Sequence, residues 1–113
     1  MAKVIITKSL EAEINKKFKG ESIKIFELMK SLEDNPKKGK PLGNVGGIII
    51  KEIRYSLCRF YFIADGYKIK MLGASELKDL IIKFVRMSDK KDQQKVINEI
   101  KDVLRKLGEQ GFS

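Results

Sequence analysis

The stretch that decides the fold is Ile48–Met87, which reads IIIKEIRYSLCRFYFIADGYKIKMLGASELKDLIIKFVRM. Four runs in it have the length and the β-branched and aromatic content of strands. They are Ile48–Tyr55, Arg59–Ala64, Tyr67–Leu72 and Leu80–Met87. Asp65-Gly66 separates the second run from the third, and an Asp-Gly pair favours a tight hairpin. This stretch therefore predicts a four-stranded meander.

The segments before the meander predict one strand and two helices. Lys3–Lys8 has the composition of a short strand. Ser9 can then cap a helix that ends near Gly20, and a second helix runs to Asn35-Pro36, where proline disfavours continuation. Each helix has a single apolar face, so we expect a helical hairpin packed against the sheet.

A loop and a last helix complete the chain. Pro36–Gly47 contains both prolines and four glycines, which predicts a surface loop. Ser88-Asp89 can cap a last helix, and the tail Glu109–Ser113 should fray. Apolar residues at helical spacing predict its buried face: Val96, Ile97, Ile100, Val103, Leu104 and Leu107.

These elements predict the fold class α+β in a single domain spanning residues 1–113. In this fold an N-terminal strand and a helical hairpin pack on a mostly antiparallel sheet of four or five strands, and a helix follows at the C-terminus.

Composition narrows the functional classes. The net charge is +9, from 24 Lys and Arg against 15 Asp and Glu, which favours a polyanionic partner. Cys58 is the only cysteine, and the chain has no histidine, so we expect neither a metal site nor a cofactor. No apolar run approaches the roughly 20 residues of a membrane span, and the N-terminus lacks a signal-peptide core. We therefore expect a cytoplasmic protein that does not contact membranes.

Basic side chains are distributed through the meander. They are Lys51, Arg54, Arg59, Lys68, Lys70, Lys83 and Arg86. Strand alternation places Phe60 and Phe62 on one face, expected to be the core, and Arg59 and Tyr61 on the other, expected to face outward. Arginine donors match a phosphate and a tyrosine ring can stack on a base, so this face is a candidate for binding RNA.

The same strands leave simpler readings open. Lys83 and Arg86 lie on opposite faces if their strand is regular, so only one of them can belong to the outward face. Glu52 is expected to pair with Arg54. The basic face can also be an ordinary solvated surface whose lysines protect the sheet from aggregation.

Several short motifs occur in a characteristic order. They are Leu42, Gly46 or Gly47, Glu52-Ile53-Arg54, Arg59-Phe60-Tyr61-Phe62, Asp65-Gly66 and Phe84-Val85-Arg86-Met87-Ser88-Asp89-Lys90. With the order of elements, they make the region from Leu32 to Ile100 resemble the RelE/ParE superfamily of toxins from toxin–antitoxin pairs, in particular its HigB-like branch. Two departures stand out. Gly73 occupies a position where relatives often have a histidine. Gly73–Ile82 is an insertion that could form an extra hairpin arm, unless Met71–Ala74 is the true counterpart and the match at Phe84 is chance.

The resemblance implies a small basic ribonuclease that cuts mRNA on the ribosome and is held inactive by a cognate antitoxin. It suggests that Arg59 holds the scissile phosphate, that Arg54 supports it, and that Lys83 or Arg86 stabilises the developing charge. The remaining candidates would bind RNA: Lys51, Tyr61, Lys68 and Lys70. Tyr61 would stack on or orient the nucleotide. A lysine whose pKa is lowered by nearby cations could deprotonate the 2′-hydroxyl.

Two other functions stay open at this point. Proteins of the ParE branch bind DNA gyrase and have no nuclease activity. The chain could also be a non-catalytic, basic module that binds nucleic acid.

Overall fold

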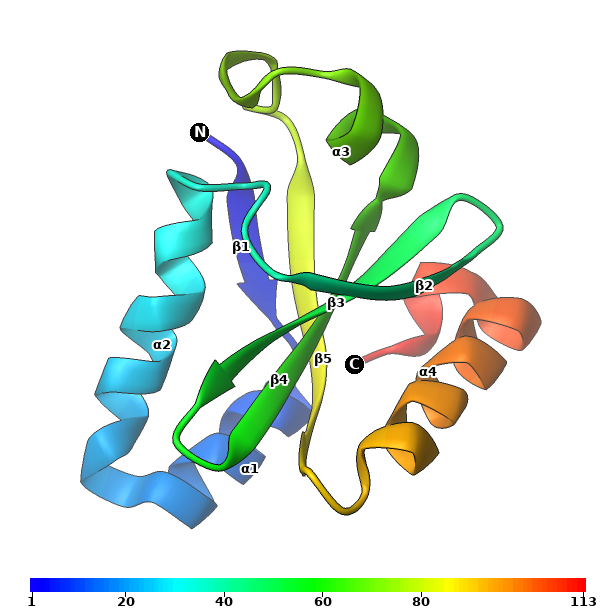
Figure 1. Cartoon of the computed structure of the whole chain (residues 1–113). Helices are drawn as coiled ribbons and strands as arrows, with labels where there is room; N and C mark the ends of the chain where they lie inside the picture. The colour runs from blue at the N-terminus through cyan, green and yellow to red at the C-terminus, as the bar shows by residue number, and fades with distance from the viewer.

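A five-stranded sheet with strand order β1-β5-β4-β3-β2 runs through the molecule (Figure 1). The structure is a computed structural model and describes all 113 residues. The strands are β1 (Lys3–Ile6), β2 (Lys40–Val45), β3 (Ile48–Tyr55), β4 (Cys58–Asp65) and β5 (Ile81–Asp89). β1 is parallel to β5, and the other neighbouring strands are antiparallel. The helices are α1 (Lys8–Phe18), α2 (Ser22–Lys30), α3 (Gly66–Met71) and α4 (Gln93–Leu107). The predicted α+β class is confirmed.

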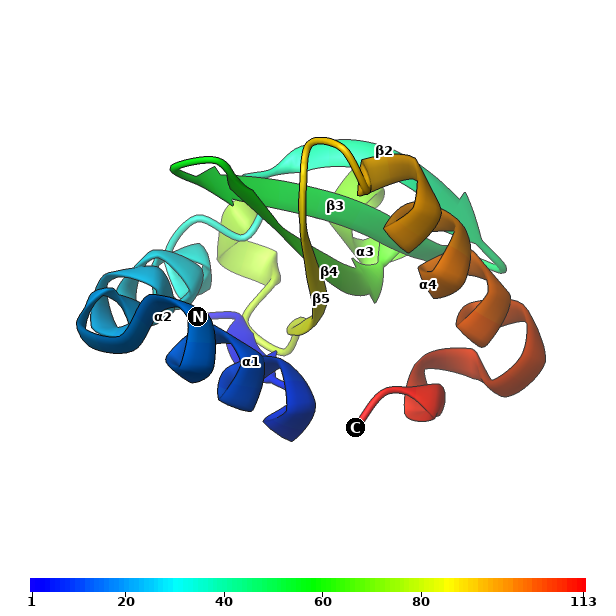
Figure 2. The ribbon, with the colours of Figure 1, turned by 90° about the horizontal axis from the view of Figure 1, so that it is seen from below.

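Helices cover both faces of this sheet. Phe60 and Phe62 of β4 pack with the apolar sides of α1 and α2 in a core of 18 buried residues. Tyr61 and Ile63 point to the other face, where they pack beneath α4 in a second core of eight buried residues. Figure 2 shows α1 and α2 on one side of the twisted sheet and α4 on the other. No helix is both long and apolar enough to span a bilayer.

The predicted loop Pro36–Gly47 contains a strand, which corrects the sequence-based expectation. Its second half is β2, which joins β3 through a turn at Gly46 and Gly47, both with positive φ (54° and 86°). A side chain at those φ values would be strained, so glycine suits this turn. β2 is an edge strand with a register shift after Pro41, which is where a proline is tolerated in a sheet.

The predicted third strand of the meander, Tyr67–Leu72, is wrong, because this segment forms helix α3. The Asp65 carboxylate accepts a hydrogen bond from the Lys68 amide at 3.1 Å, so Asp65 caps a helix instead of starting a hairpin. The following connection contains a single 3₁₀ turn, Ala74–Glu76, before β5 begins. Gly73–Ile82 is therefore not an extra hairpin arm.

Two helices begin at residues other than the expected ones. Thr7, and not Ser9, caps α1, with its Oγ1 accepting from the Leu10 amide at 3.3 Å. Ser88 and Asp89 end β5, and α4 begins only at Gln93.

The C-terminal part of α4 also departs from expectation. Ile97, Ile100 and Leu104 are buried as predicted, whereas Leu107 is exposed. The tail does not fray: Gly108–Gly111 forms a 3₁₀ turn and Phe112 is buried.

Candidate anion-binding site

A pocket of about 380 Å³ lies where the β3–β4 turn approaches the connection from β5 to α4, at the lower end of the view in Figure 1. We call it the basic pocket. Its lining residues are Arg54, Ser56, Leu57, Arg59, Asp89, Lys90 and Lys91. Four of these side chains are cations and one is a carboxylate, so the pocket is suited to an anion.

Strand pairing brings the two arginines together. Arg54 and Arg59 are directly opposite each other on β3 and β4, and directly paired residues project from the same face of a sheet. The turn between them is only Ser56-Leu57, with Ser56 at φ 57°. Lys90 and Lys91 follow immediately after Asp89, which pairs with Cys58 at the start of β4. The ends of three strands therefore contribute to one pocket.

Glu52 lies beneath the two arginines. Its side chain is 1% exposed, and its Oε2 lies 3.4 Å from Arg54 Nε and 3.6 Å from Arg59 Nε. Gln93, in the first turn of α4, donates to its other oxygen at 3.3 Å. The expected pairing of Glu52 with Arg54 is confirmed, and Arg59 joins it. A buried carboxylate that faces two guanidinium groups neutralises part of their charge and restricts their orientation.

Arg59 has an unused donor. The residue is 7% exposed, and its Nε is buried without a hydrogen-bond partner, since 3.6 Å to Glu52 is too long for a hydrogen bond. Buried polar groups in proteins are nearly always paired. Arg59 also lines the basic pocket, so a bound anion can contact the exposed part of its guanidinium while Nε stays beside Glu52.

The expectation that Arg59 and Tyr61 face outward is wrong, because α4 covers this face of the sheet. Tyr61 is 0% exposed, and its hydroxyl lies 2.7 Å from Ser88 Oγ. Burial raises the pKa of Tyr61, and the hydrogen bond with Ser88 opposes this shift. The ring is part of the core and is not available for stacking on a base.

Lys83 and Arg86 share a face after all. The pairing of β4 with β5 shifts between Tyr61 and Phe62, so that Arg86 lies opposite Tyr61 and Lys83 opposite Ile63. This β-bulge inserts one extra residue and removes the regular alternation. Both cations therefore lie on the face of the basic pocket, but neither lines it.

Lys51 lies on the opposite face, because it pairs with Phe62. It is buried, and its Nζ donates to the Lys37 carbonyl at 2.8 Å. Burial lowers the pKa of Lys51, and the nearby charge of Lys37 lowers it further. A lysine on this side of the sheet cannot reach an anion in the basic pocket.

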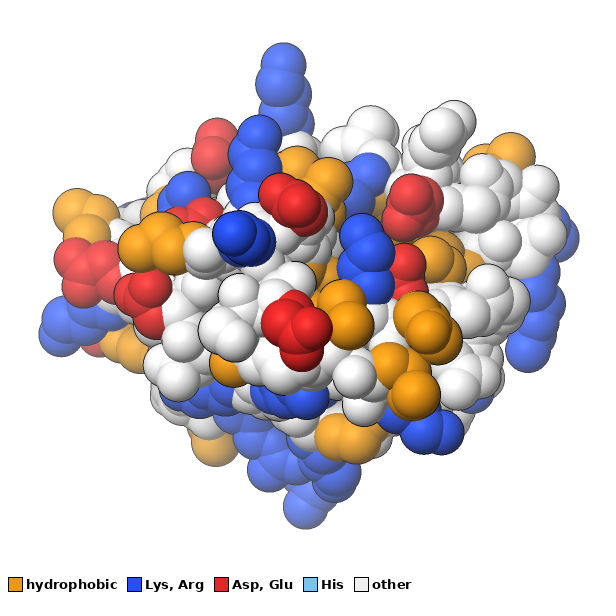
Figure 3. Space-filling view, turned by 90° about the horizontal axis from the view of Figure 1, so that it is seen from above, with side chains coloured by type: hydrophobic (Ala, Val, Ile, Leu, Met, Phe, Trp, Pro, Cys, Tyr) orange, Lys and Arg blue, Asp and Glu red, His pale blue; other side chains and the backbone are white.

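Lys68 and Lys70 lie on α3, not on a strand, and neither lines the basic pocket. Figure 3 views the molecule from the top of Figure 1, the end that carries α3. Acidic and hydrophobic side chains are mixed there with the basic ones, so no single charge dominates that surface.

The sequence-based reasoning missed five polar contributors. Asp89, Lys90 and Lys91 line the pocket, Gln93 holds Glu52, and Ser88 holds Tyr61. A signal was present, because two adjacent lysines follow directly after a strand that carries other candidates. The predicted cap at Ser88-Asp89 would have placed Lys90 and Lys91 in the first turn of the last helix.

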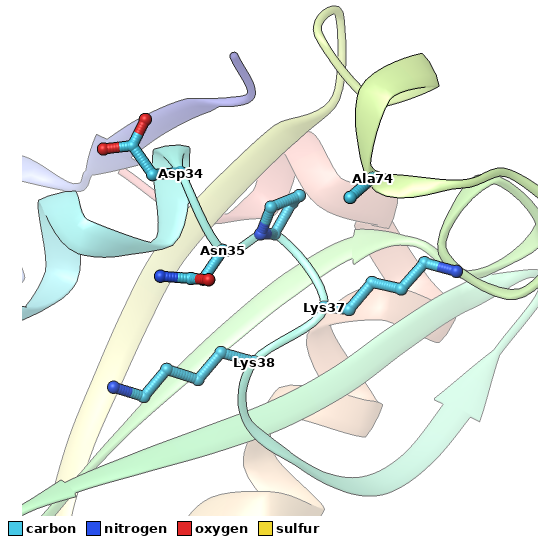
Figure 4. Close-up of a pocket in the computed structure, with 6 residues that line it drawn as sticks. Asp34, Asn35, Lys37, Lys38 and Ala74 are labelled. Carbon is cyan, nitrogen blue, oxygen red and sulfur yellow. The ribbon is translucent and has the colours of Figure 1, made fainter.

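Another pocket, of about 490 Å³, lies at the connection from α2 to β2 (Figure 4). It is lined by Asp34, Asn35, Pro36, Lys37, Lys38 and Ala74. In Figure 4, Lys37 and Lys38 extend in opposite directions, and Asp34 points away from both. Side chains that diverge in this way do not converge on a ligand. No three Asp, Glu or Cys side chains come together as a metal site would require.

The chain matches no protein-family model, no curated protein and no solved structure. The fold and the site define an α+β protein with a cationic pocket.

Proposed function

We propose that this protein is the toxin of a toxin–antitoxin pair and cleaves mRNA on the ribosome, with the scissile phosphate bound in the basic pocket. The observation that carries the proposal is the buried Arg59, which pairs only with Glu52, at a distance too long for a hydrogen bond, and lies in a pocket rimmed by three other cations. The motifs that resemble the RelE/ParE superfamily, Glu52-Ile53-Arg54 and Arg59–Phe62, form the strands behind this pocket.

The pocket can supply the electrostatic part of RNA cleavage. Attack of a 2′-hydroxyl on its neighbouring phosphate increases the negative charge on the phosphate oxygens. Preorganised donors at that position stabilise the transition state more than the ground state. Arg59 is held in place by Glu52. Arg54, Lys90 and Lys91 are more exposed, so their side chains can adjust to the phosphates of a bound RNA strand.

A proton acceptor is also present in the pocket. Asp89 is its only lining carboxylate, and Asp89 Oδ1 accepts a hydrogen bond from the Asp92 amide at 2.9 Å. In the proposed mechanism, the second oxygen of Asp89 accepts the proton of the 2′-hydroxyl. The 2′-oxygen then bonds to phosphorus as the bond from phosphorus to the 5′-oxygen breaks, and Lys90 or Lys91 donates a proton to the departing 5′-oxygen. This role takes the place of the lysine base that the resemblance suggested.

The proposal implies partners and a location. Ribosomes and mRNA place the protein in the cytoplasm, and a cognate antitoxin would have to block it. The candidate antitoxin surface is the open edge of β2 beside α4, because an unpaired strand edge can accept a further strand.

Ribosome-bound mRNA in a cell-free translation extract tests the proposal. We expect the wild type to cut at defined codons, and Arg59→Ala to lose about 10²-fold or more in rate, as when one transition-state donor is removed. Lys90→Ala/Lys91→Ala tests the exposed rim without disturbing the core. Lys95→Ala, an exposed change on α4, is the matched control and should cut normally.

Intact message during continued translation would refute ribonuclease activity. A gyrase supercoiling assay with the same protein would then separate the two remaining functions. Inhibition there would indicate a ParE-like toxin, and no effect would leave a basic nucleic-acid-binding module.

A further inference from the structure

The C-terminal segment Gly108–Ser113 covers two cations of β5. Lys83 Nζ donates to the carbonyl oxygens of Glu109 and Phe112, at 3.1 Å and 3.0 Å. The Arg86 guanidinium lies 5.0 Å from the centre of the Phe112 ring, and Phe112 is 3% exposed although it is the penultimate residue. The segment therefore holds both cations in contacts with its backbone and its one aromatic ring.

Neither of these cations has a carboxylate partner. The four ion pairs of the chain are Lys30–Glu33, Arg54–Glu52, Arg59–Glu52 and Arg105–Asp102. Arg86 makes one further hydrogen bond, from Nη1 to the Val85 carbonyl of its own strand. A phosphate would add an attraction between opposite charges that the neutral carbonyls lack, and a guanidinium can bind it through two parallel hydrogen bonds, so it would be a better partner than the carbonyls.

The two cations continue the line of the basic pocket along the sheet. On β4, Arg59, Tyr61 and Ile63 lie opposite Ser88, Arg86 and Lys83 of β5. Two residues advance a strand by about 6.7 Å, so Arg86 and then Lys83 lie at successive steps of this size beyond Arg59. An extended RNA strand bound at Arg59 would therefore reach Arg86 and Lys83 next.

Open space borders the covering segment on two sides. An open pocket of about 580 Å³ adjoins Phe112 and Ser113, and another of about 270 Å³ adjoins Glu109 and Gln110. Gly108, at φ 70°, connects the segment to α4, and glycine changes backbone conformation at low cost.

We propose that Lys83 and Arg86 form a second phosphate subsite, which the segment Gly108–Ser113 closes and a bound RNA strand opens. This rests on the proposed function, because the ligand is the same strand that the basic pocket holds. The subsite takes the strand's phosphates, and the segment competes with them for both cations.

Binding of a labelled single-stranded RNA oligonucleotide over a salt series tests the subsite. Phe112→Ala weakens the cover, so affinity should rise by up to about tenfold, the gain expected if the wild-type segment is open for roughly a tenth of the time. Its salt dependence should match the wild type, because the same phosphates are bound. Ile23→Ala, an exposed apolar side chain of α2, is the matched control and should not change affinity.

Removing the cations should reduce the salt dependence. Lys83→Met/Arg86→Met in the Phe112→Ala background should lower the slope of log K against log salt by about 1.4, at roughly 0.7 for each phosphate of a single strand. Lys95→Met/Lys106→Met on α4 removes the same charge away from the subsite and should lower it by much less. Equal slopes for the two double variants would overturn the subsite.

A measurement on the unmodified protein covers the case in which Phe112→Ala does not fold. Carboxypeptidase release of Ser113 and Phe112, followed by mass, should be faster in the presence of the oligonucleotide. Unchanged or slower release would overturn the proposal. If the binding and release results are as expected but no message is cut, the subsite stands and ribonuclease activity fails. If message is cut but the binding and release responses are absent, ribonuclease activity stands and the subsite fails. If no variant binds RNA, the ribonuclease proposal and the subsite are both refuted.

Discussion

The two faces of the sheet differ in what they bury. The face under α1 and α2 packs aromatic and aliphatic side chains in a core of 18 residues, including Phe60, Phe62 and Phe84, and Lys51 is its one buried charged side chain. The face under α4 has a core of eight, and beside it lie the buried polar side chains of Glu52, Arg59 and Ser88. The first face supplies most of the hydrophobic stabilisation. The second face contributes less, because it buries polar side chains that hold charges in fixed positions. The candidate site accordingly lies on the face with the smaller core.

The largest expected effect comes from a change on the apolar face, the one under α1 and α2. Phe62→Ala should lower the free energy of unfolding by about 3–5 kcal/mol, because Phe62 is 0% exposed and its ring lies 4.9 Å from that of Phe84. Urea unfolding measures the change. Ile23→Ala, which is exposed, should stay within about 0.5 kcal/mol. Since Phe62 does not contact the basic pocket, the folded fraction should bind RNA as the wild type does. Weaker binding per folded molecule would show that the two faces are coupled.

A smaller effect is expected on the charged face. Glu52→Gln leaves the Arg59 guanidinium buried without its counter-charge, which should cost about 3 kcal/mol of stability. Glu99→Gln, on the exposed side of α4, is the matched control and should be nearly neutral. Thermal or urea unfolding measures both. If the two variants were equally stable, Glu52 would not hold the arginines, and the contrast between the faces would fail.

The smallest expected effect is the pH dependence that Cys58, a buried thiol at the start of β4, gives to stability. Burial raises the pKa of Cys58 above its ordinary value of 9.0, and the charge of Lys17 opposes this. The folded state thus favours the neutral thiol. The stability from this group is fully present below about pH 9 and is lost as the pH rises through the folded-state pKa.

Urea unfolding between neutral and alkaline pH checks this prediction. The wild type should lose more stability over the range than Cys58→Ala, which lacks the group. The other ionisable groups are common to both proteins and cancel in the difference. Parallel curves for the two proteins would mean that the thiol is solvated.

Local sequence signals predicted the elements that carry their own pattern. β3 and β4 were predicted from the length and the β-branched and aromatic content of their runs, and the bounds of β3 agree with the prediction. β2 could not be found in this way, because Lys40–Val45 has little strand propensity and is held by pairing with β3. Asp65-Gly66 is compatible with a hairpin and with a helix cap, and the buried Ile69 shows that packing of α3 on the core selected the helix.

The residues of the candidate site were predicted only in part, because local sequence signals do not show how separate elements pack together. Arg54 and Arg59 were identified, because they lie on strands whose alternation was clear. Tyr61 was predicted on the correct face of the sheet, but as exposed rather than buried. Strand alternation shows which side chains share a face, and it does not show which element covers that face. Lys83 and Arg86 were separated because a β-bulge has no reliable signature in a single sequence.

The sequence alone determined the α+β class, the positive charge, and the alternation that divides β4 between two faces. These properties depend on composition and on neighbours along the chain. Only the tertiary structure decided that α4 buries Tyr61, that Lys90 and Lys91 meet Arg54 and Arg59, and that the C-terminus closes over Lys83 and Arg86. Those contacts join residues far apart in sequence, and they form only when the packing of whole elements compensates the entropy of bringing them together.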